Sequence, residues 1–378
     1  MMDKIIFTIE GKEFFVRKDL VKSDFFVVRS IPRSYPVKWA EQTKPQEIIN
    51  NLMAENSENI LFIDKNVYDI YGNYLEIPKS KIFVAEATEG FKTLDGFVGL
   101  IEFLQKNQFT KGGSLIVVGG GIIQDIGAFA GASYKRGIRW IYLPTTLLAM
   151  CDSCIGGKAG INHNNAKNQL AIFSSPSQVI IDPIFLETLT DRDIKAGLGE
   201  ILKLHIIGGK EFLKIYKHYI TDAMSHNYPA FKPLILGSLN IKKSIIEKDE
   251  FELKHRKALN YGHTVGHALE VLSNYRIPHG QAVVLGMIVA NELSNRKHLL
   301  SRKENNLLKN LSFDLLDQDI LRGLSTSKLG ELLQKDKKTS GSLLTFILLK
   351  SIGETRLVPI HLNSIFIDEI SEIIAEYL

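Results

Sequence analysis

The chain has 378 residues, of which 45% are hydrophobic and 23% are charged, and its formal net charge is +4 at pH 7. Such a chain is expected to be globular and is long enough for two domains. The mild charge, without dense Lys/Arg stripes, argues against a nucleic-acid-binding protein. No apolar run reaches transmembrane length, and the first residues alternate like a strand and carry charges, unlike a signal peptide. We therefore expect a cytoplasmic protein with no membrane partner.

The first half of the chain alternates short apolar runs with amphipathic stretches. Strands are predicted at residues 5–10, 13–18 and 24–30, and a helix at residues 45–54. Further strands are then predicted to alternate with helices, the strands at residues 58–64, 81–87, 114–121, 140–146 and 178–183 and the helices at 67–75, 93–107 and 126–134. This rhythm predicts a parallel sheet of the nucleotide-binding type.

The pattern changes after Pro183, where long helical periodicity replaces the strand signals. It begins with residues 186–207, continues through 256–284 and ends with 364–378. We therefore predict an α/β domain at residues 1–183 and an all-α domain at residues 184–378.

Three glycines, Gly119 to Gly121, follow the apolar run LIVV and precede Asp125 and a predicted helix. Glycines at a strand-to-helix turn let the backbone approach a diphosphate, and the helix N-terminus presents free amides to the anion. The motif is not the GxGxxG fingerprint, so a merely tight loop is the alternative.

A dense polar segment follows between the two halves of the chain. Cationic side chains interspersed with amides and glycines suit a small oxygenated anion, because charge-assisted hydrogen bonds hold phosphate or carboxylate from several directions. A solvated loop is the alternative, but a lysine beside two glycines among apolar residues, in GGKAGIN, is unusual for a surface loop. The segment contains Arg136, Arg139, Asp152, Lys158, Asn162, His163, Lys167 and Asn168.

Three histidines in the helical half form a pattern typical of a metal site. His263 and His267 lie four residues apart, so they project from the same face of a helix, and His279 follows shortly after Pro278. Imidazole is the commonest protein ligand of divalent transition metals, and three protein ligands with one open position form the usual catalytic arrangement. Chance spacing on a helix surface is the alternative.

Two shorter motifs are ambiguous by themselves. Glu200 and Lys203 lie three residues apart on a predicted helix, where they form either an exposed salt bridge or part of the metal site. Cys151 and Cys154 form one CxxC, which is redox-active, half of a zinc site or a pair of packed small residues. The apolar neighbours of the cysteines and the lack of a second pair favour packing.

Together, these segments resemble the 3-dehydroquinate synthases and the related sugar phosphate cyclases. The resemblance rests on GGGIIQD at residues 119–125, residues 134–162, Lys167 with Asn168, AGLGEILK at 196–203, KALNYGHTVGHALE at 257–270 and HGQAVVLGM at 279–287. It implies a Rossmann-like N-terminal α/β domain that binds NAD+ and a helical C-terminal domain that holds Zn2+ or Co2+, with the substrate between them. Relatives also suggest a homodimer.

The resemblance implies a role for each matching position. The metal ligands would be Glu200, His263 and His279, which moves His267 to the substrate side. The NAD+ contacts would be Asp64, Asn66, Glu89, Lys92, Gly119, Gly120, Gly121, Asp125, Thr145, Thr146, Asp152, Lys167 and Asp182. The catalytic and substrate residues would be Lys203, His267, Asn260, Lys158, Arg136 and Asn168, with Lys242 and Arg256 at a carboxylate and Lys337 or Lys338 closing over the substrate.

The chemistry that the resemblance implies explains this mixture of residues. In the family, NAD+ transiently oxidises a secondary alcohol, which acidifies the neighbouring C–H so that phosphate is eliminated. The hydride then returns, and the ring opens and closes by an aldol step. A metal ion polarises the hydroxyl and later the carbonyl. Imidazole, lysine and the departing phosphate transfer the protons. NAD+ emerges unchanged, so the implied net reaction is that of a lyase.

Departures from the common dehydroquinate synthase motifs bear on the substrate. Gln169, His205 and Gln281 are the polar novelties, and the beginning VVRSIPRSYPVKW resembles that of cyclases acting on sedoheptulose 7-phosphate. Those cyclases typically replace the residues corresponding to His267 and Asn260 by proline and aspartate, whereas this chain keeps both.

The pair Lys242 and Arg256 further implies a carboxylate on the substrate. We therefore expect a 3-dehydroquinate synthase acting on 3-deoxy-D-arabino-heptulosonate 7-phosphate, in the shikimate pathway of aromatic amino acid biosynthesis. A sedoheptulose 7-phosphate cyclase is the alternative.

Two other classes stay open. A metal- and NAD-dependent polyol dehydrogenase, of the iron-containing alcohol dehydrogenase type, would share the glycine turn, the helical domain and the HxxxH. A dehydrogenase of this type does not need four cations together, here Arg136, Lys158, Lys242 and Arg256. A catalytically silent relative serving in binding or assembly would not need the complete set of metal ligands.

Overall fold

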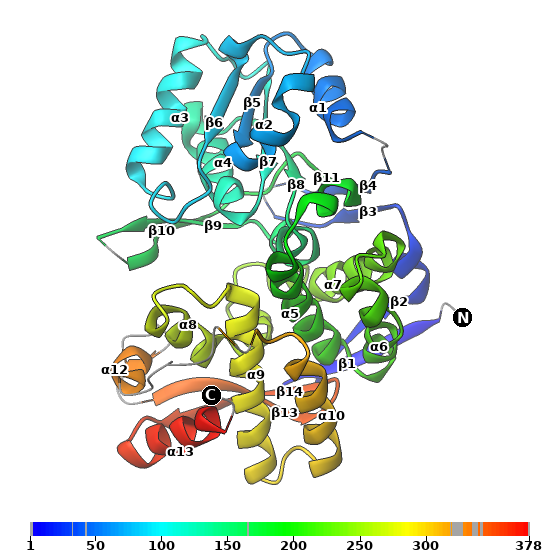
Figure 1. Cartoon of the computed structure of the whole chain (residues 1–378), viewed down its shortest axis with the longest axis vertical. Coiled ribbons are helices and arrows are strands. Elements are labelled where there is room, and N and C mark those ends of the chain that lie inside the picture. Colours follow the sequence, from blue (N-terminus) through cyan, green and yellow to red (C-terminus); the bar gives the residue numbers. More distant parts are fainter. Residues whose placement is uncertain are drawn as a thin grey trace. The chain divides into compact units, whose positions relative to one another are not determined.

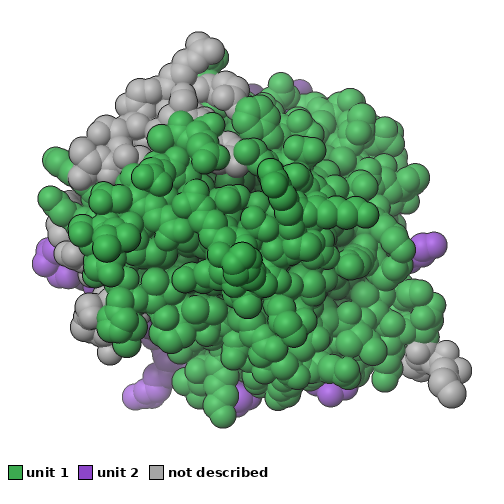
Figure 2. Space-filling view, turned by 90° about the horizontal axis from the view of Figure 1, so that it is seen from below, with its two compact units in different colours: residues 1–21, 190–378 green, residues 22–189 purple. Residues whose placement is uncertain are grey.

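The computed structural model describes residues 3–31, 33–41, 44–164, 166–317, 319, 328–334, 339–340 and 343–376. It divides into two compact units, which Figure 1 shows as a ribbon and Figure 2 colours separately. Unit 1 comprises Met1–Val21 and Thr190–Leu378, and unit 2 comprises Lys22–Leu189. Within the described ranges, no helix combines the length and the apolar character needed to cross a membrane.

The described part of unit 2 is built on a seven-stranded sheet with the order β3-β4-β11-β8-β7-β5-β6. The strands from β4 to β6 in this order run parallel, and β3 is antiparallel to β4. Every residue of β5 and β7 is buried, as expected for parallel strands covered on both faces. The strands are β3 (Phe25–Val28), β4 (Tyr35–Trp39), β5 (Ile60–Asp64), β6 (Ile82–Ala85), β7 (Ser114–Gly119), β8 (Arg139–Pro144) and β11 (Gln178–Ile181).

Helices flank this sheet, with α3 on one side and α1 on the other (Figure 1). Two of them begin at a side-chain cap: the side chain of Asp64 accepts a hydrogen bond at the start of α2, and that of Thr93 does so at the start of α3. A separate hairpin of β9 (Lys158–His163) and β10 (Ala166–Phe173) packs against α4. The helices are α1 (Pro45–Ala54), α2 (Lys65–Tyr71), α3 (Leu94–Lys106) and α4 (Gly121–Ser133).

Unit 1 is mainly helical and surrounds α5, which is buried along most of its length. Thr190 caps α5 by accepting a hydrogen bond from the backbone amide of Asp193 at 3.2 Å. The described helices are α5 (Asp191–Gly208), α6 (Lys210–Met224), α7 (Phe231–Ile246), α8 (His263–Leu272), α9 (His279–Arg296), α10 (Arg302–Phe313), α12 (Leu329–Gln334) and α13 (Ser364–Ala375).

Unit 1 also contains a sheet with the order β12-β13-β14-β1-β2. Strand β1 pairs antiparallel with β2 and parallel with β14, so strands from both ends of the chain meet in one sheet. The strands are β1 (Lys4–Ile9), β2 (Lys12–Arg17), β12 (Thr339–Ser340), β13 (Leu343–Ser351) and β14 (Glu354–His361).

The predicted fold class is confirmed, with one correction. The C-terminal half is not all-α, because β12, β13 and β14 lie in it. The unit boundaries also differ from the predicted domains 1–183 and 184–378, because unit 2 ends at Leu189 and β1 and β2 belong to unit 1. The reason is physical: alternation predicts that a segment is a strand, but it does not predict which sheet the strand joins.

Candidate active site

Several predicted cofactor residues lie at the carboxyl edge of the parallel sheet in unit 2. Asp64 ends β5, and its Oδ1 accepts a hydrogen bond from the backbone amide of Asn66 at 2.9 Å. Gly119 ends β7, Thr145 follows β8 and Asp182 follows β11. Since β6 and β7 lie on opposite sides of β5, the strand order reverses there. Open α/β sheets bind their ligands beside the carboxyl ends of the strands at such a point.

The glycine turn after β7 is shaped by close contacts. Gly120 is the N-cap of α4, and a Cβ on it would lie 3.0 Å from Cγ2 of Thr146. A Cβ on Gly119 would lie 2.7 Å from Cβ of Ile123. Glycine therefore allows the turn to fold closely against its own helix and against the end of β8. The first amides of α4 have no partner within the helix, which suits a phosphate group.

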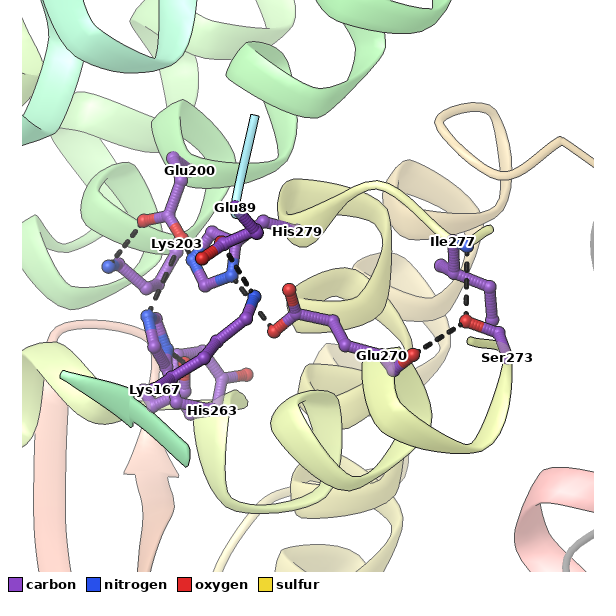
Figure 3. Close-up of polar contacts among 10 residues, drawn as sticks. Glu89, Lys167, Glu200, Lys203, His263, Glu270, Ser273, Ile277 and His279 are labelled. Atoms are coloured by element: carbon purple, nitrogen blue, oxygen red, sulfur yellow. Dashed lines mark hydrogen bonds and ion pairs between the residues drawn. The ribbon is translucent and has the colours of Figure 1, made fainter. Parts of the chain in front are cut away.

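A charged network in unit 2 joins four more predicted residues. Lys92 is buried, and its Nζ lies 2.5 Å from Oδ2 of Asp125. Burial raises the pKa of Asp125 to about 6, although the Lys92 ammonium opposes this effect. Nζ of Lys167 lies 2.9 Å from Oε1 of Glu89, as Figure 3 shows, and Asn162 donates to Oε2 of Glu89 at 2.7 Å. These contacts tie the β9–β10 hairpin to residues 89–92.

The other predicted residues of unit 2 lie in different places. Lys158 begins β9, and Asn168 lies in β10 with a φ of 53°. Asp152 belongs to the short π-helix Ala149–Ser153. Arg136 precedes β8, so it lies at the edge of the sheet opposite to the one that carries Thr145. There it lines a pocket of about 470 Å³ with Arg33 and Arg139, among other residues.

In unit 1, three predicted metal ligands converge (Figure 3). Oε1 of Glu200 lies 3.3 Å from Nε2 of His279 and 3.6 Å from Nε2 of His263. One ligand atom from each residue lies within 4.8 Å of the other two. Oε2 of Glu200 forms an ion pair with Nζ of Lys203 one turn further along α5. Two imidazoles and a carboxylate are a donor set that suits Zn2+ or Co2+.

Glycines bring the three helices close enough for this convergence. A Cβ on Gly280, next to His279, would lie 1.7 Å from the carbonyl oxygen of Ala196, so α9 meets α5 backbone to backbone. A Cβ on Gly286 would lie 1.8 Å from the carbonyl oxygen of Gly262, which precedes His263. A residue larger than glycine at either position would push apart two of the segments that carry the predicted metal ligands.

The electrostatics of the cluster also suit a cation. Burial acts to lower the pKa of His279, but the carboxylates of Glu200 and Glu270 outweigh it and raise the pKa to about 10. The carboxylates thus hold a proton on His279 at neutral pH. A divalent ion would displace that proton, since imidazole binds a metal in its neutral form.

Of the predicted substrate residues of unit 1, His267 lies beside this cluster. The ring of His267 is exposed, and its centroid lies 5.3 Å from that of His263 and 5.8 Å from that of His279. Lys242 and Arg256 are buried, which is unusual for cations. Asn260 donates to Oε1 of Glu252 at 2.8 Å. Lys337 and Lys338 lie outside the described residues.

One residue of this site was not assigned a role from the sequence. Glu270, in the quoted motif GHALE, lies 3.1 Å from Nδ1 of His279 through its Oε2. Its spacing of three from His267, on the same helix face, was the available signal.

The CxxC is a packing feature in this structure. Cys151 and Cys154 are buried, and their Sγ atoms donate to the carbonyl oxygens of Leu148 at 3.5 Å and Met150 at 3.4 Å. Their buried, apolar surroundings match the interpretation favoured from the sequence.

Comparison with known proteins identifies the family. The model for the N-terminal domain of 3-dehydroquinate synthase matches residues 82–196, and that for the C-terminal domain matches residues 197–339. This chain belongs to the 3-dehydroquinate synthase family. The 3-dehydroquinate synthase of Crocosphaera subtropica is 35% identical over 338 residues, which cover 85% of this chain and 92% of that protein.

Solved structures share the fold of this family member. 2-Deoxy-scyllo-inosose synthase, complexed with carbaglucose-6-phosphate, NAD+ and Co2+, matches with a TM-score of 0.80 and 24% identity over 94% of this chain and 100% of that chain. The 2-epi-5-epi-valiolone synthase of Streptomyces hygroscopicus, with NAD+ and Zn2+ bound, matches with a TM-score of 0.74 and 22% identity over 93% and 99%.

Proposed function

We propose that this chain is a 3-dehydroquinate synthase, an NAD+- and metal-dependent lyase that converts 3-deoxy-D-arabino-heptulosonate 7-phosphate into 3-dehydroquinate and phosphate. The observation that carries the proposal is the convergence of Glu200, His263 and His279 in a chain of this family. The proposal includes a cytoplasmic homodimer that serves the shikimate pathway and so aromatic amino acid biosynthesis.

Each cofactor is assigned to residues whose placement suits it. NAD+ would lie along the carboxyl edge of the sheet of unit 2, with its diphosphate at the Gly119–Gly121 turn, Asp64 near a ribose and the Glu89–Lys167 pair nearby. The divalent ion would be held by Glu200, His263 and His279. When bound, NAD+ accepts and returns a hydride, and the ion acts as a Lewis acid on the substrate oxygens.

The remaining residues of unit 1 bind and orient the substrate. Lys242 and Arg256 supply buried positive charge for the carboxylate of the heptulosonate, and the fork of Arg256 can form two parallel hydrogen bonds with it. His267 moves protons at the reacting centre, because it is the exposed imidazole beside the metal ligands. Lys203, held by Glu200, donates to a ring hydroxyl.

The cations of unit 2 are assigned to the phosphate. Lys158 and Asn168 belong to the β9–β10 hairpin and supply a charge and an amide to it. The family resemblance also implies this role for Arg136, which lies at the edge of the sheet of unit 2 opposite to the NAD+ residues.

The test supplies the purified protein with NAD+, Zn2+ or Co2+ and one candidate substrate at a time. Phosphate release with 3-deoxy-D-arabino-heptulosonate 7-phosphate, and 3-dehydroquinate as the carbocycle, are expected without net formation of NADH. If this substrate is inert while sedoheptulose 7-phosphate is cyclised, the substrate assignment is wrong. Steady accumulation of NADH with a polyol would instead identify a dehydrogenase.

A substitution of Arg256 tests recognition of the substrate carboxylate in the same assay. Arg256→Met keeps much of the length of the side chain and removes its charge, so it should raise KM for the heptulosonate by about 10-fold or more, as expected for the loss of a charge-assisted hydrogen bond. Lys297→Met, on the exposed C-cap of α9, is the control for removing one cation and should leave KM unchanged.

A further inference from the structure

The two histidines of the metal site are held by different second partners. Nδ1 of His263 lies 3.2 Å from the carbonyl oxygen of Tyr261, and Nδ1 of His279 lies 3.1 Å from Oε2 of Glu270. In both rings the other nitrogen, Nε2, faces Glu200. Each ring therefore has one nitrogen toward the ligand cluster and one toward an oxygen acceptor.

This pairing decides which nitrogen can bind a metal. A neutral imidazole carries one N–H and one lone pair, and the acceptor beside Nδ1 keeps the hydrogen there, which leaves the lone pair on Nε2. A carboxylate accepts this hydrogen bond more strongly than a carbonyl does and makes the ligating nitrogen more basic. Glu270 can therefore affect metal affinity without touching the ion.

The local structure holds Glu270 in place for this contact (Figure 3). The residue is 7% exposed and lies in the last turns of α8. Its carbonyl oxygen accepts hydrogen bonds from Oγ of Ser273 at 2.9 Å and from the amide of Tyr275 at 2.8 Å. Oγ of Ser273 in turn accepts from the amide of Ile277 at 3.2 Å. The short connection from α8 to His279 is thus fixed at both ends.

We propose that Glu270 is a positioning residue, which accepts the Nδ1 hydrogen of His279, orients Nε2 toward the ion and sets the affinity of the site for a divalent metal. This inference rests on the metal site of the proposed function. A competing arrangement exists, because Glu270, His267 and His279 form a second group whose ligand atoms lie within 4.8 Å of one another. The exposure of His267 and the shared use of His279 favour one ion rather than two.

The test measures binding of Zn2+ and Co2+ to the metal-free protein by competition with a chelator. Wild type should bind one ion per chain. Glu270→Gln keeps an oxygen acceptor but loses the charge, and should weaken binding by about 10-fold; Glu270→Ala removes the acceptor and should weaken it by about 10- to 100-fold. The Co2+ absorption spectrum of Glu270→Gln should match that of wild type at saturation, since the ligands are unchanged.

The controls separate positioning from other effects. Glu372→Gln removes one exposed carboxylate from α13 and should bind metal like wild type. The melting temperature of each metal-free variant shows whether it is folded. If Glu270→Ala does not fold, the metal affinity of Glu270→Gln tests the proposal. Wild-type affinity in the folded Gln and Ala variants, or two ions per wild-type chain, would overturn the proposal. Failure of wild type to bind any divalent ion would instead refute the metal site of the proposed function.

Discussion

At the scale of single residues, Gln281 has a partner far along the chain. The fully buried Gln281 donates from Nε2 to Oδ2 of Asp317 at 2.8 Å, and its Oε1 accepts from the amide of Asp317 at 3.0 Å. Nζ of Lys195 lies 2.5 Å from Oδ1 of the same aspartate. Burial acts to raise the pKa of Asp317, but Gln281 and Lys195 outweigh it and lower the pKa. A glutamine at position 281 is thus explained by a local contact rather than by the substrate.

Gln281→Glu should therefore destabilise the protein. The change removes an amide donor and sets a buried carboxylate against that of the half-buried Asp317, which should lower the free energy of unfolding by about 1–3 kcal/mol. Adding Asp317→Asn to this variant supplies an amide donor to the introduced carboxylate and should recover part of the loss. Denaturant unfolding of wild type, both single variants and the double variant measures this coupling, and strictly additive effects would contradict it.

His205 links stability to pH. It lies fully buried in α5, with Nδ1 2.9 Å from the carbonyl oxygen of Phe212 and Nε2 3.1 Å from that of Leu234. Burial lowers its pKa from 6.5 to about 4, although both carbonyls oppose this effect. Between pH 6.5 and pH 4 the imidazole of His205 is protonated in the unfolded chain but stays neutral in the folded chain. The free energy of unfolding should therefore fall as the pH is lowered through this range.

The difference between 6.5 and about 4 corresponds to a loss of about 3 kcal/mol from this group. His205→Gln cannot titrate, so its stability should fall less than that of wild type over this range. Denaturant unfolding at several pH values measures the two slopes. His218→Gln, at an exposed position of α6, controls for the loss of a histidine elsewhere. Identical slopes for wild type and His205→Gln would show that His205 is not responsible.

At the scale of helices, the contact between α5 and α9 is fixed by Gly280. Gly280→Ala would place a methyl group 1.7 Å from the carbonyl oxygen of Ala196, so the two backbones must separate. We expect a loss of stability of about 1–3 kcal/mol and weaker metal binding, because His279 moves relative to Glu200. Thermal unfolding of the metal-free protein and chelator competition measure the two effects.

A second glycine provides the matched control. Gly99 lies inside α3, and a Cβ there would meet its nearest atom, Cζ of Phe83, at 3.8 Å. Gly99→Ala should be tolerated or should stabilise the protein by about 0.5–1 kcal/mol, because alanine favours the helix. If both substitutions have the same effect, close packing of α5 against α9 is not the cause.

The elements of unit 2 were largely predictable because their signals are local. The apolar runs that became β5 and β7 are continuous, and the stretch that became α3 is amphipathic and capped by Thr93.

The metal site was harder to predict from local signals. Their spacing in the sequence suggests a metal site of His263, His267 and His279. In the structure, the ligand atoms of His263 and His279 instead lie close to Glu200, which belongs to another helix. The residues alone left Glu200 open as a metal ligand or as half of an exposed salt bridge, and the family resemblance implied the exchange of His267 for Glu200.

The contacts that sequence reasoning missed are those between distant segments. The hydrogen bond between Glu270 and His279 depends on the turn that joins α8 to α9, and that between Gln281 and Asp317 spans a difference of 36 positions. Periodicity carries no information about either, because it reports which face of an element is buried and not what lies opposite.

The division of the chain into two units shows the same limit of sequence patterns. The change in pattern near residue 183 lies close to the observed boundary at Leu189. The sequence does not indicate which unit the first strands join, because β1 and β2 are ordinary strands by sequence and their membership of unit 1 depends on pairing with β14.

The pairing of β1 with β14 also orders the events of biosynthesis. A ribosome releases β1 before unit 2, but its parallel neighbour at Glu354–His361 emerges only after all of unit 2 has left the exit tunnel. Unit 2 is one uninterrupted segment and can fold while synthesis continues. Until β14 emerges, one edge of the hairpin of β1 and β2 stays unpaired. Unit 1 is therefore completed after unit 2, although two of its strands are made before unit 2.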